Sequence, residues 1–201
     1  MLTAEVRSAT EQDQQSVIDV ITLAFSADPM ARWAYPDAPT YLAAMPEMVR
    51  AFGGNGFAHG TVHLVDGGAA AAMWLPPGVH PDSERLTALT EQHAPRERLA
   101  DMTKVFDQMA GYHPPDPCWY LPLIGVDPVH QGRGHGSTLL RYALEQCDRD
   151  GLPAYLESSN PRNIPLYERH GFEIMGSIQA GASPTIVPML RRPLSSRRPT
   201  T

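Results

Sequence analysis

The chain is 201 residues long and 42% hydrophobic, which suits one globular domain with a substantial core. Its formal net charge of −6 argues against a nucleic-acid partner held by bulk positive charge. Two cysteines are too few for a disulfide framework, and no signal sequence is evident. The uncharged stretch at residues 67–81 is too short to cross a bilayer, so we expect a cytoplasmic protein with no membrane partner.

The N-terminal part of the chain predicts a short strand and two helices. The strand is expected at residues 6–7, and Thr10 then begins a helix with a weakened capping box. Asp28-Pro29 is expected to end this helix. Residues 30–39, which contain two prolines, are expected to form a loop, and a second helix is expected from Thr40 to about Gly53.

A hairpin and two further helices are expected next. Residues 61–65 and 69–75 flank Asp66-Gly67-Gly68, which is a typical hairpin turn between two apolar runs. Apolar residues at helical spacing predict the two helices at residues 83–92 and from 96 to about 109.

The most informative stretch follows. Residues 119–126 form a β-branched and aromatic run that predicts a buried strand, and Asp127-Pro128 ends it. The glycine-rich segment QGRGHGS, residues 131–137, comes next, and apolar residues from Leu139 to Cys147 then recur at helical spacing. A strand therefore leads through a glycine-rich turn into the N-terminus of a helix that is expected to end at Asp150.

Such a junction favours an anionic ligand, because the first N–H groups of a helix lack intrahelical acceptors and glycines allow close approach of a phosphate. A Walker loop would require Lys and then Ser or Thr after its last glycine, and a dinucleotide loop would require G-x-G-x-x-G; neither spacing is present. The remaining pattern, Q-x-x-G-x-G with Gln131, Gly134 and Gly136, resembles the acetyl-CoA-binding loop of the GNAT superfamily of N-acetyltransferases.

A second motif strengthens this resemblance. After a strand expected at residues 154–158, Asn163, Leu166-Tyr167 and Gly171-Phe172 are similar to the second acetyl-CoA-contacting segment of the superfamily. From Pro117 to Phe172 the sequence also resembles the puromycin N-acetyltransferase group, whereas the likeness is looser in the N-terminal half.

No repeat or linker is evident, so we expect a single α+β domain over residues 1–194 with a tail at residues 195–201 that is disordered. A last hairpin is expected from residues 172–178 and 185–190. The resemblance implies a mixed, mostly antiparallel sheet flanked by helices, with a β-α-β acetyl-CoA-binding core at about residues 117–172.

The resemblance also implies the cofactor-binding residues. The Val126 backbone is expected to contact the pantetheine arm of acetyl-CoA. Asn163 is expected to form a hydrogen bond with the pantetheine region, although it could instead serve only as a helix N-cap. The backbone N–H groups of residues 133–137 are expected to hold the pyrophosphate. The full expected set is Ile124, Val126, Gln131, Gly132, Arg133, Gly134, His135, Gly136, Ser137, Asn163 and Tyr167.

Acetyl transfer to an amine requires a neutral amine and a proton donor for the departing thiolate. Tyr167 is the leading general acid, and a packed core tyrosine is the alternative interpretation. Residues 119–126 contain no carboxylate, so Glu157 is the leading base, although it could instead be structural. Asp28 and Asp37 are the next candidates.

The acceptor pocket is less clearly predicted. Trp33, Tyr35 and Trp74 are candidates to line it, although each could belong to the core. The histidines show no metal-ligand spacing, so no metal is expected, and His130 and His135 are expected to point outward from the cofactor loop.

We therefore expect an N-acetyltransferase that uses acetyl-CoA as cosubstrate and acetylates a primary amine of a small molecule by direct attack in a ternary complex. It is expected to act as a monomer or homodimer. Two alternatives stay open: a protein N-terminal or lysine acetyltransferase, which would need an open groove, and a catalytically weak acetyl-CoA-binding sensor. The sequence does not identify the acceptor.

Overall fold

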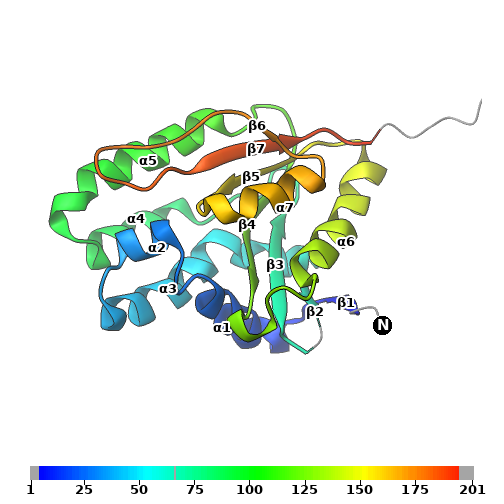
Figure 1. The fold of residues 1–201 in the computed structure, drawn as a ribbon, viewed down its shortest axis with the longest axis horizontal. Coiled ribbons are helices and arrows are strands. Elements are labelled where there is room, and N and C mark those ends of the chain that lie inside the picture. Colours follow the sequence, from blue (N-terminus) through cyan, green and yellow to red (C-terminus); the bar gives the residue numbers. More distant parts are fainter. Residues whose placement is uncertain (1–4, 66, 195–201) are drawn as a thin grey trace, which may run out of the picture.

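One mixed sheet of seven strands runs through the computed structural model, which describes residues 5–65 and 67–194 (Figure 1). The strand order is β1-β2-β3-β4-β5-β7-β6, and every neighbouring pair is antiparallel except β4 and β5. The strands are β1 (Val6–Ser8), β2 (Val62–Val65), β3 (Ala70–Leu75), β4 (Trp119–Val126), β5 (Ala154–Ser158), β6 (Glu173–Ile174) and β7 (Val187–Arg191).

Helices cover both faces of the sheet. They are α1 (Gln14–Ala24), α2 (Pro29–Ala34), α3 (Ala38–Gly53), α4 (Ser83–His93), α5 (Leu99–Tyr112), α6 (His135–Asp150) and α7 (Ile164–Arg169). Side chains alternate along β3, so Ala71 and Met73 pack in the core beneath α1 and α3, while Ala72 and Trp74 pack beneath α6. The expected single α+β domain with a mixed, mostly antiparallel sheet is confirmed.

Most predicted elements are present close to their predicted bounds. The hairpin of β2 and β3, the buried strand β4, helix α6 ending at Asp150, and β5 all form where the sequence predicts them. No helix in the described ranges is both long enough and apolar enough to cross a membrane. The predicted tail at residues 195–201 and the turn residue Asp66 lie outside the described residues, and so does the start of the predicted domain.

The interpretation of residues 28–39 was wrong in part. Helix α1 ends at Ala24, and Asp28-Pro29 begins the short helix α2 within the segment that was expected to be a loop. The Asp28 carboxylate accepts hydrogen bonds from the N–H groups of Met30 and Ala31, both at 3.0 Å, while Pro29 occupies the first helical position. Asp followed by Pro thus acts here as an N-cap signal and not as a stop.

The last hairpin is also shorter than predicted. Strand β6 contains two residues, and beyond it the two segments are joined by a hydrogen bond from the Met175 N–H to the Pro188 carbonyl and by the isolated bridge between Ile178 and Ile186. Strand β7 instead forms its longer ladder with β5.

The strands β4 and β5 separate after a short parallel contact, and this separation positions the site. Their pairing is limited to Trp119 with Ala154 and Tyr120 with Tyr155 among the described residues. Just beyond this contact Trp74 of β3 lies opposite two residues of β4, Leu121 and Pro122, so β4 carries a bulge there. The two strands then diverge, as Figure 1 shows, and leave a gap between their carboxyl ends.

Candidate active site

A cleft of about 590 Å³ fills the gap between β4 and β5. Its walls are the end of β4, the glycine-rich loop, the first turn of α6, the segment after β5, and α7. Every predicted cofactor residue lines this cleft except Arg133. The exposed Arg133 guanidinium instead donates a hydrogen bond of 3.4 Å to the Val129 carbonyl. Glu157 lines the same cleft.

The glycine-rich loop has the geometry of an anion cradle. Gly132 and Gly134 adopt φ values of 75° and 86°, which disfavour any residue with a side chain. Gly134 is the N-cap of α6, and the first intrahelical bond runs from the Thr138 N–H to its carbonyl at 3.0 Å. The Gln131 amide bonds the Val126 carbonyl at 3.3 Å and so ties the loop to β4. This loop fits the diphosphate of acetyl-CoA.

Sequence reasoning missed two basic residues of the cleft. Arg162 and Arg169 line it from the segment after β5 and from the end of α7. Cations at this place complement phosphate groups. Both arginines lie inside the second motif, so their position in the sequence was a usable signal.

Two side chains of the cleft do not have the arrangement that could be expected from the sequence. His135 was expected to point outward, but it is buried, and its ring centroid lies 6.4 Å from that of His130. Asn163 is exposed at the start of α7 and makes no capping hydrogen bond with its side chain. Asn160 is the residue that caps this turn, because its side chain accepts the Arg162 N–H at 3.1 Å.

Tyr167 combines a core position with a place in the cleft. It is 5% exposed, and its ring packs edge-on against Phe172 with a centroid distance of 6.0 Å. Burial raises the pKa of the Tyr167 hydroxyl, and the nearby negative charge of Asp28 raises it further. The phenol therefore keeps its proton at neutral pH.

Glu157 lies on β5 and lines the cleft beside the point where the strands separate. Burial raises the pKa of its carboxyl group to about 7, although the hydroxyl groups of Tyr120 and Tyr155, as hydrogen-bond donors, offset part of this effect. A carboxylate with such a pKa can accept a proton near neutral pH.

Asp28 is the other carboxylate of the site. It is buried, its Oδ2 accepts the Ser159 hydroxyl at 2.7 Å, and its Oδ1 accepts the two N–H groups of α2. Burial raises the Asp28 pKa, and these hydrogen bonds partly offset the shift. The bond to Ser159 joins residues that are 131 positions apart in the chain.

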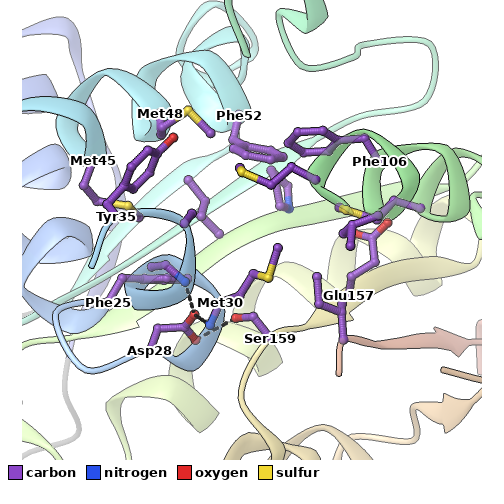
Figure 2. Close-up of a pocket in the computed structure, with 18 of the residues that line it drawn as sticks. Phe25, Asp28, Met30, Tyr35, Met45, Met48, Phe52, Phe106, Glu157 and Ser159 are labelled. Carbon is purple, nitrogen blue, oxygen red and sulfur yellow. Dashed lines mark hydrogen bonds between the residues drawn. The ribbon is translucent and has the colours of Figure 1, made fainter. Parts of the chain in front are cut away.

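A second cavity, of about 120 Å³, lies between α2, α3, α5 and the two separated strands (Figure 2). It meets the cleft where the two share Phe25, Asp28, Pro122, Glu157 and Ser159.

Of the three predicted acceptor residues, Tyr35 lines this second cavity, whereas Trp33 and Trp74 line neither space. The Arg98 guanidinium carbon lies over Trp33, 5.6 Å from the centroid of the indole ring. Trp74 is fully buried beneath α6. Asp37 also lies away from both spaces, as the N-cap of α3.

Comparison with known proteins agrees with this geometry. Residues 80–172 match the model of the acetyltransferase (GNAT) family. This part of the chain, less than half of its length, is therefore similar to that family. The match contains both β4 and β5, the glycine-rich loop and α7, and thus most of the cleft, whereas Ala24, Phe25, Ala27 and Asp28 of its lining lie outside the match.

Individual relatives cover the GNAT region or share the fold. An uncharacterised N-acetyltransferase of Schizosaccharomyces pombe is 41% identical over 81 residues, which are 39% of this chain and 33% of that protein. The mycothiol acetyltransferase of Thermobifida fusca is 36% identical over 78 residues, 37% of this chain and 24% of that protein. The chain thus spans a third or less of the length of these two relatives.

A structural neighbour covers nearly the whole chain. A solved structure from Corynebacterium glutamicum, described as histone acetyltransferase HPA2 and related acetyltransferase, has a TM-score of 0.70 over 98% of this chain and 99% of its own. Its sequence identity is 23%, so this likeness shows the GNAT fold alone. Much of the second cavity, from Phe25 to Phe52, lies outside the region that the GNAT family model matches.

Proposed function

We propose that the chain is an acetyl-CoA-dependent N-acetyltransferase that acetylates a primary amine of a small molecule. The observation that carries this proposal is the junction between the cleft and the second cavity, where Glu157 and Asp28 face both spaces. A donor in the cleft and an amine in the cavity would meet there without an enzyme-bound acetyl group.

The cleft residues bind and orient the cosubstrate in this proposal. The first turn of α6 with Arg162 and Arg169 would hold the phosphates, and Asn163 and the β4 edge near Val126 would hold the pantetheine arm. Arg133 was predicted to contribute its backbone N–H, but it does not line the cleft, so it is left out of this set.

Two side chains move protons. When bound, acetyl-CoA supplies the acetyl group as a thioester. Glu157 takes the proton that the acceptor ammonium must lose before its nitrogen bonds to the acetyl carbon. Tyr167 gives a proton to the sulfur as the carbon–sulfur bond breaks, so that a neutral thiol leaves, and the second proton that the acetylated nitrogen loses restores the Tyr167 hydroxyl.

A small acceptor is favoured over a protein. The cavity that adjoins the catalytic junction lies between three helices and the sheet and has a volume of about 120 Å³, whereas a peptide would require an extended groove. The likeness of residues 117–172 to the puromycin N-acetyltransferase group also supports a small-molecule amine.

The proposal is tested by measuring free thiol after mixing the full chain with acetyl-CoA and a panel of amines and peptides. We expect thiol release that depends on a small primary amine, with the acetylated amine identified by mass spectrometry. If acetyl-CoA binds but no amine or peptide raises thiol release above the rate of acetyl-CoA hydrolysis, the protein is a binder and not an enzyme. Preferential acetylation of peptides would instead support the protein-directed alternative.

A further inference from the structure

The second cavity is built mainly from soft, apolar side chains. Five of the nine methionines in the chain line it, together with three phenylalanines; these are Met30, Met45, Met48, Met102, Met109, Phe25, Phe52 and Phe106. Methionine side chains are flexible and polarisable, and they adapt to ligands of irregular shape. The lining therefore suits an apolar body and gives little hydrogen bonding to a polar one.

Two side chains supply the charge in the cavity. Among the described residues that line it, Asp28 and Glu157 are the only charged ones, and both are acidic. Both also belong to the junction with the cleft. Figure 2 shows Phe52 and Phe106 across the cavity from Asp28, so the end that lies away from the junction is apolar.

Asp28 is fixed in place, as an anchor for a cation would have to be. Three donors hold its two oxygens, at 3.0, 3.0 and 2.7 Å, and the donor from Ser159 brings the segment after β5 against α2. The Asp28 carboxylate is also close enough to Tyr167 to influence its hydroxyl. A cation that pairs with Asp28 thus lies beside the reacting groups.

The volume limits the size of the apolar body. A closed apolar cavity of roughly 150 Å³ holds one benzene molecule. This cavity, at about 120 Å³, is of that order. It therefore fits one aromatic ring or an aliphatic chain of about six carbons.

We propose that this cavity is the acceptor site and that it selects a primary amine with one compact apolar body, whose ammonium group is held by Asp28. This inference rests on the proposed function and adds the substrate class. A diamine, a polyamine or an aminoglycoside would place a second cation or several hydroxyl groups mostly among methionine and phenyl side chains, where they would lack an anionic partner and find few hydrogen-bond partners.

The first test compares matched amines on the full chain with saturating acetyl-CoA. Hexylamine and 1,6-diaminohexane have the same carbon chain and differ by one terminal amine, which is charged at pH 8. We expect kcat/KM for hexylamine and for 2-phenylethylamine to exceed that for 1,6-diaminohexane by at least about tenfold. Equal values for hexylamine and the diamine would overturn the inference and leave the proposed function standing.

The second test uses Asp28→Asn with Asp37→Asn as its matched control. Both residues are N-caps of helices that have proline in the first turn, and asparagine caps as well as aspartate. We expect Asp28→Asn to raise KM for hexylamine about tenfold and to leave KM for acetyl-CoA nearly unchanged. Asp37→Asn is expected to change neither value. An unchanged hexylamine KM in folded Asp28→Asn would overturn the role of Asp28.

A third variant covers the case in which Asp28→Asn does not fold. Phe106→Glu places a carboxylate at the apolar end, and it should raise the ratio of diamine to hexylamine turnover about tenfold if that end receives the distal amine. If no amine is acetylated at all, the proposed function fails. Calorimetry with CoA-loaded protein then decides the inference: binding of hexylamine but not of 1,6-diaminohexane supports it, and equal or absent binding overturns it.

Discussion

Tyr167 must serve the core and the chemistry with one side chain. Its ring belongs to the hydrophobic cluster beneath α6, and its hydroxyl retains its proton because burial raises its pKa. We predict that Tyr167→Phe keeps the fold and lowers kcat about 10² to 10⁴ fold, the range for a positioned proton donor. Pre-steady-state and steady-state thiol release measure this change. Tyr142→Phe, on the exposed side of α6, is the control and should retain the wild-type kcat.

The expected loss for Tyr167→Phe lies in kcat, because the proton is transferred only as the thiolate departs. The loss should shrink with acyl donors whose thiol is more acidic, since these leave without help. A wild-type kcat in the phenylalanine variant, with acetyl transfer shown to be the slow step, would leave Tyr167 as a core residue only.

Glu157 should make the reaction depend on pH near neutrality. Burial raises its pKa to about 7, so below pH 7 it is protonated and cannot accept the ammonium proton, and above pH 7 it can. We predict that wild-type kcat/KM rises with pH through about 7 and that Glu157→Gln lacks this rise. The deficit of the variant should be largest near pH 8 and smaller near pH 10, where the amine is increasingly neutral by itself.

Folding of the Glu157→Gln variant is checked by its urea midpoint. The raised pKa means that the folded state disfavours the charged carboxylate, so stability of the wild type falls as pH rises from about 4.5 to 7. Glutamine avoids this charge and should be at least as stable as the wild type at pH 8. A Glu157→Gln pH profile that coincides with that of the exposed control Glu168→Gln would assign the base to another group.

Local sequence signals predicted the elements that form the cleft well and those that form the second cavity poorly. The glycine-rich loop and α6 follow from spacing within about twenty consecutive residues, because a helix start is decided by local backbone chemistry. Helix α2 was missed although Asp28-Pro29 is a regular N-cap and first-turn proline. The same dipeptide can also end a helix, and only the packing of α2 over the sheet decides between the two.

The two ends of α6 offer a matched test of the loop. Gly134 and Gly151 have φ values of 86° and 67°, and a Cβ at either would meet open space, so a side chain at either position costs about 1 kcal/mol in strain. They lie about 24 Å apart along the helix. We predict that Gly134→Asp loses most acetyl-CoA binding, because its carboxylate would lie where the pyrophosphate binds, whereas Gly151→Asp retains it.

Thermal unfolding with and without acetyl-CoA measures this difference. At about one hundred times its dissociation constant, acetyl-CoA should stabilise the wild type and Gly151→Asp by roughly 2.7 kcal/mol, which raises Tm by about 5–10 °C. Gly134→Asp should show little shift. Equal shifts in the two folded variants would contradict the placement of the phosphates at this loop.

The whole molecule shows why the second cavity was not predictable from local patterns. Its lining comes from α2, α3, α5, the separated strands and Ile186, which are far apart in sequence. Tyr35 and the fully buried Trp74 look alike as aromatic residues in an apolar context, and only the three-dimensional arrangement places one in the cavity and the other under α6. Asp28 was only a secondary candidate for the base. Its place in the site depends on its hydrogen bond to Ser159, which is 131 positions away in the chain, so local sequence patterns could not indicate it.

The C-terminal strand is fixed to α6 by an ion pair that lies outside the candidate site. Arg191 of β7 is 5% exposed, and its guanidinium makes two bonds of 2.8 Å to the Asp148 carboxylate, while its Nε donates to the His170 carbonyl. Asp148 also accepts the Leu194 N–H at 2.8 Å. Hydrogen bonding from Arg191 lowers the pKa of Asp148.

We predict that Asp148→Asn destabilises the whole domain by roughly 2–4 kcal/mol, because it leaves the Arg191 charge buried without its partner. This loss is somewhat smaller than that expected on breaking a fully buried ion pair, because Asp148 is partly exposed. A lowered pKa means that the contribution is complete above the unfolded value near 3.8 and is lost as pH falls below it. Urea unfolding should therefore show the full difference at pH 7 and a difference that shrinks progressively as pH falls below about 3.8 toward the lowered pKa of the folded state. Asp107→Asn, exposed on α5, is the control, and a pH-independent difference for Asp148→Asn would show that shape and not charge makes this contact stabilising.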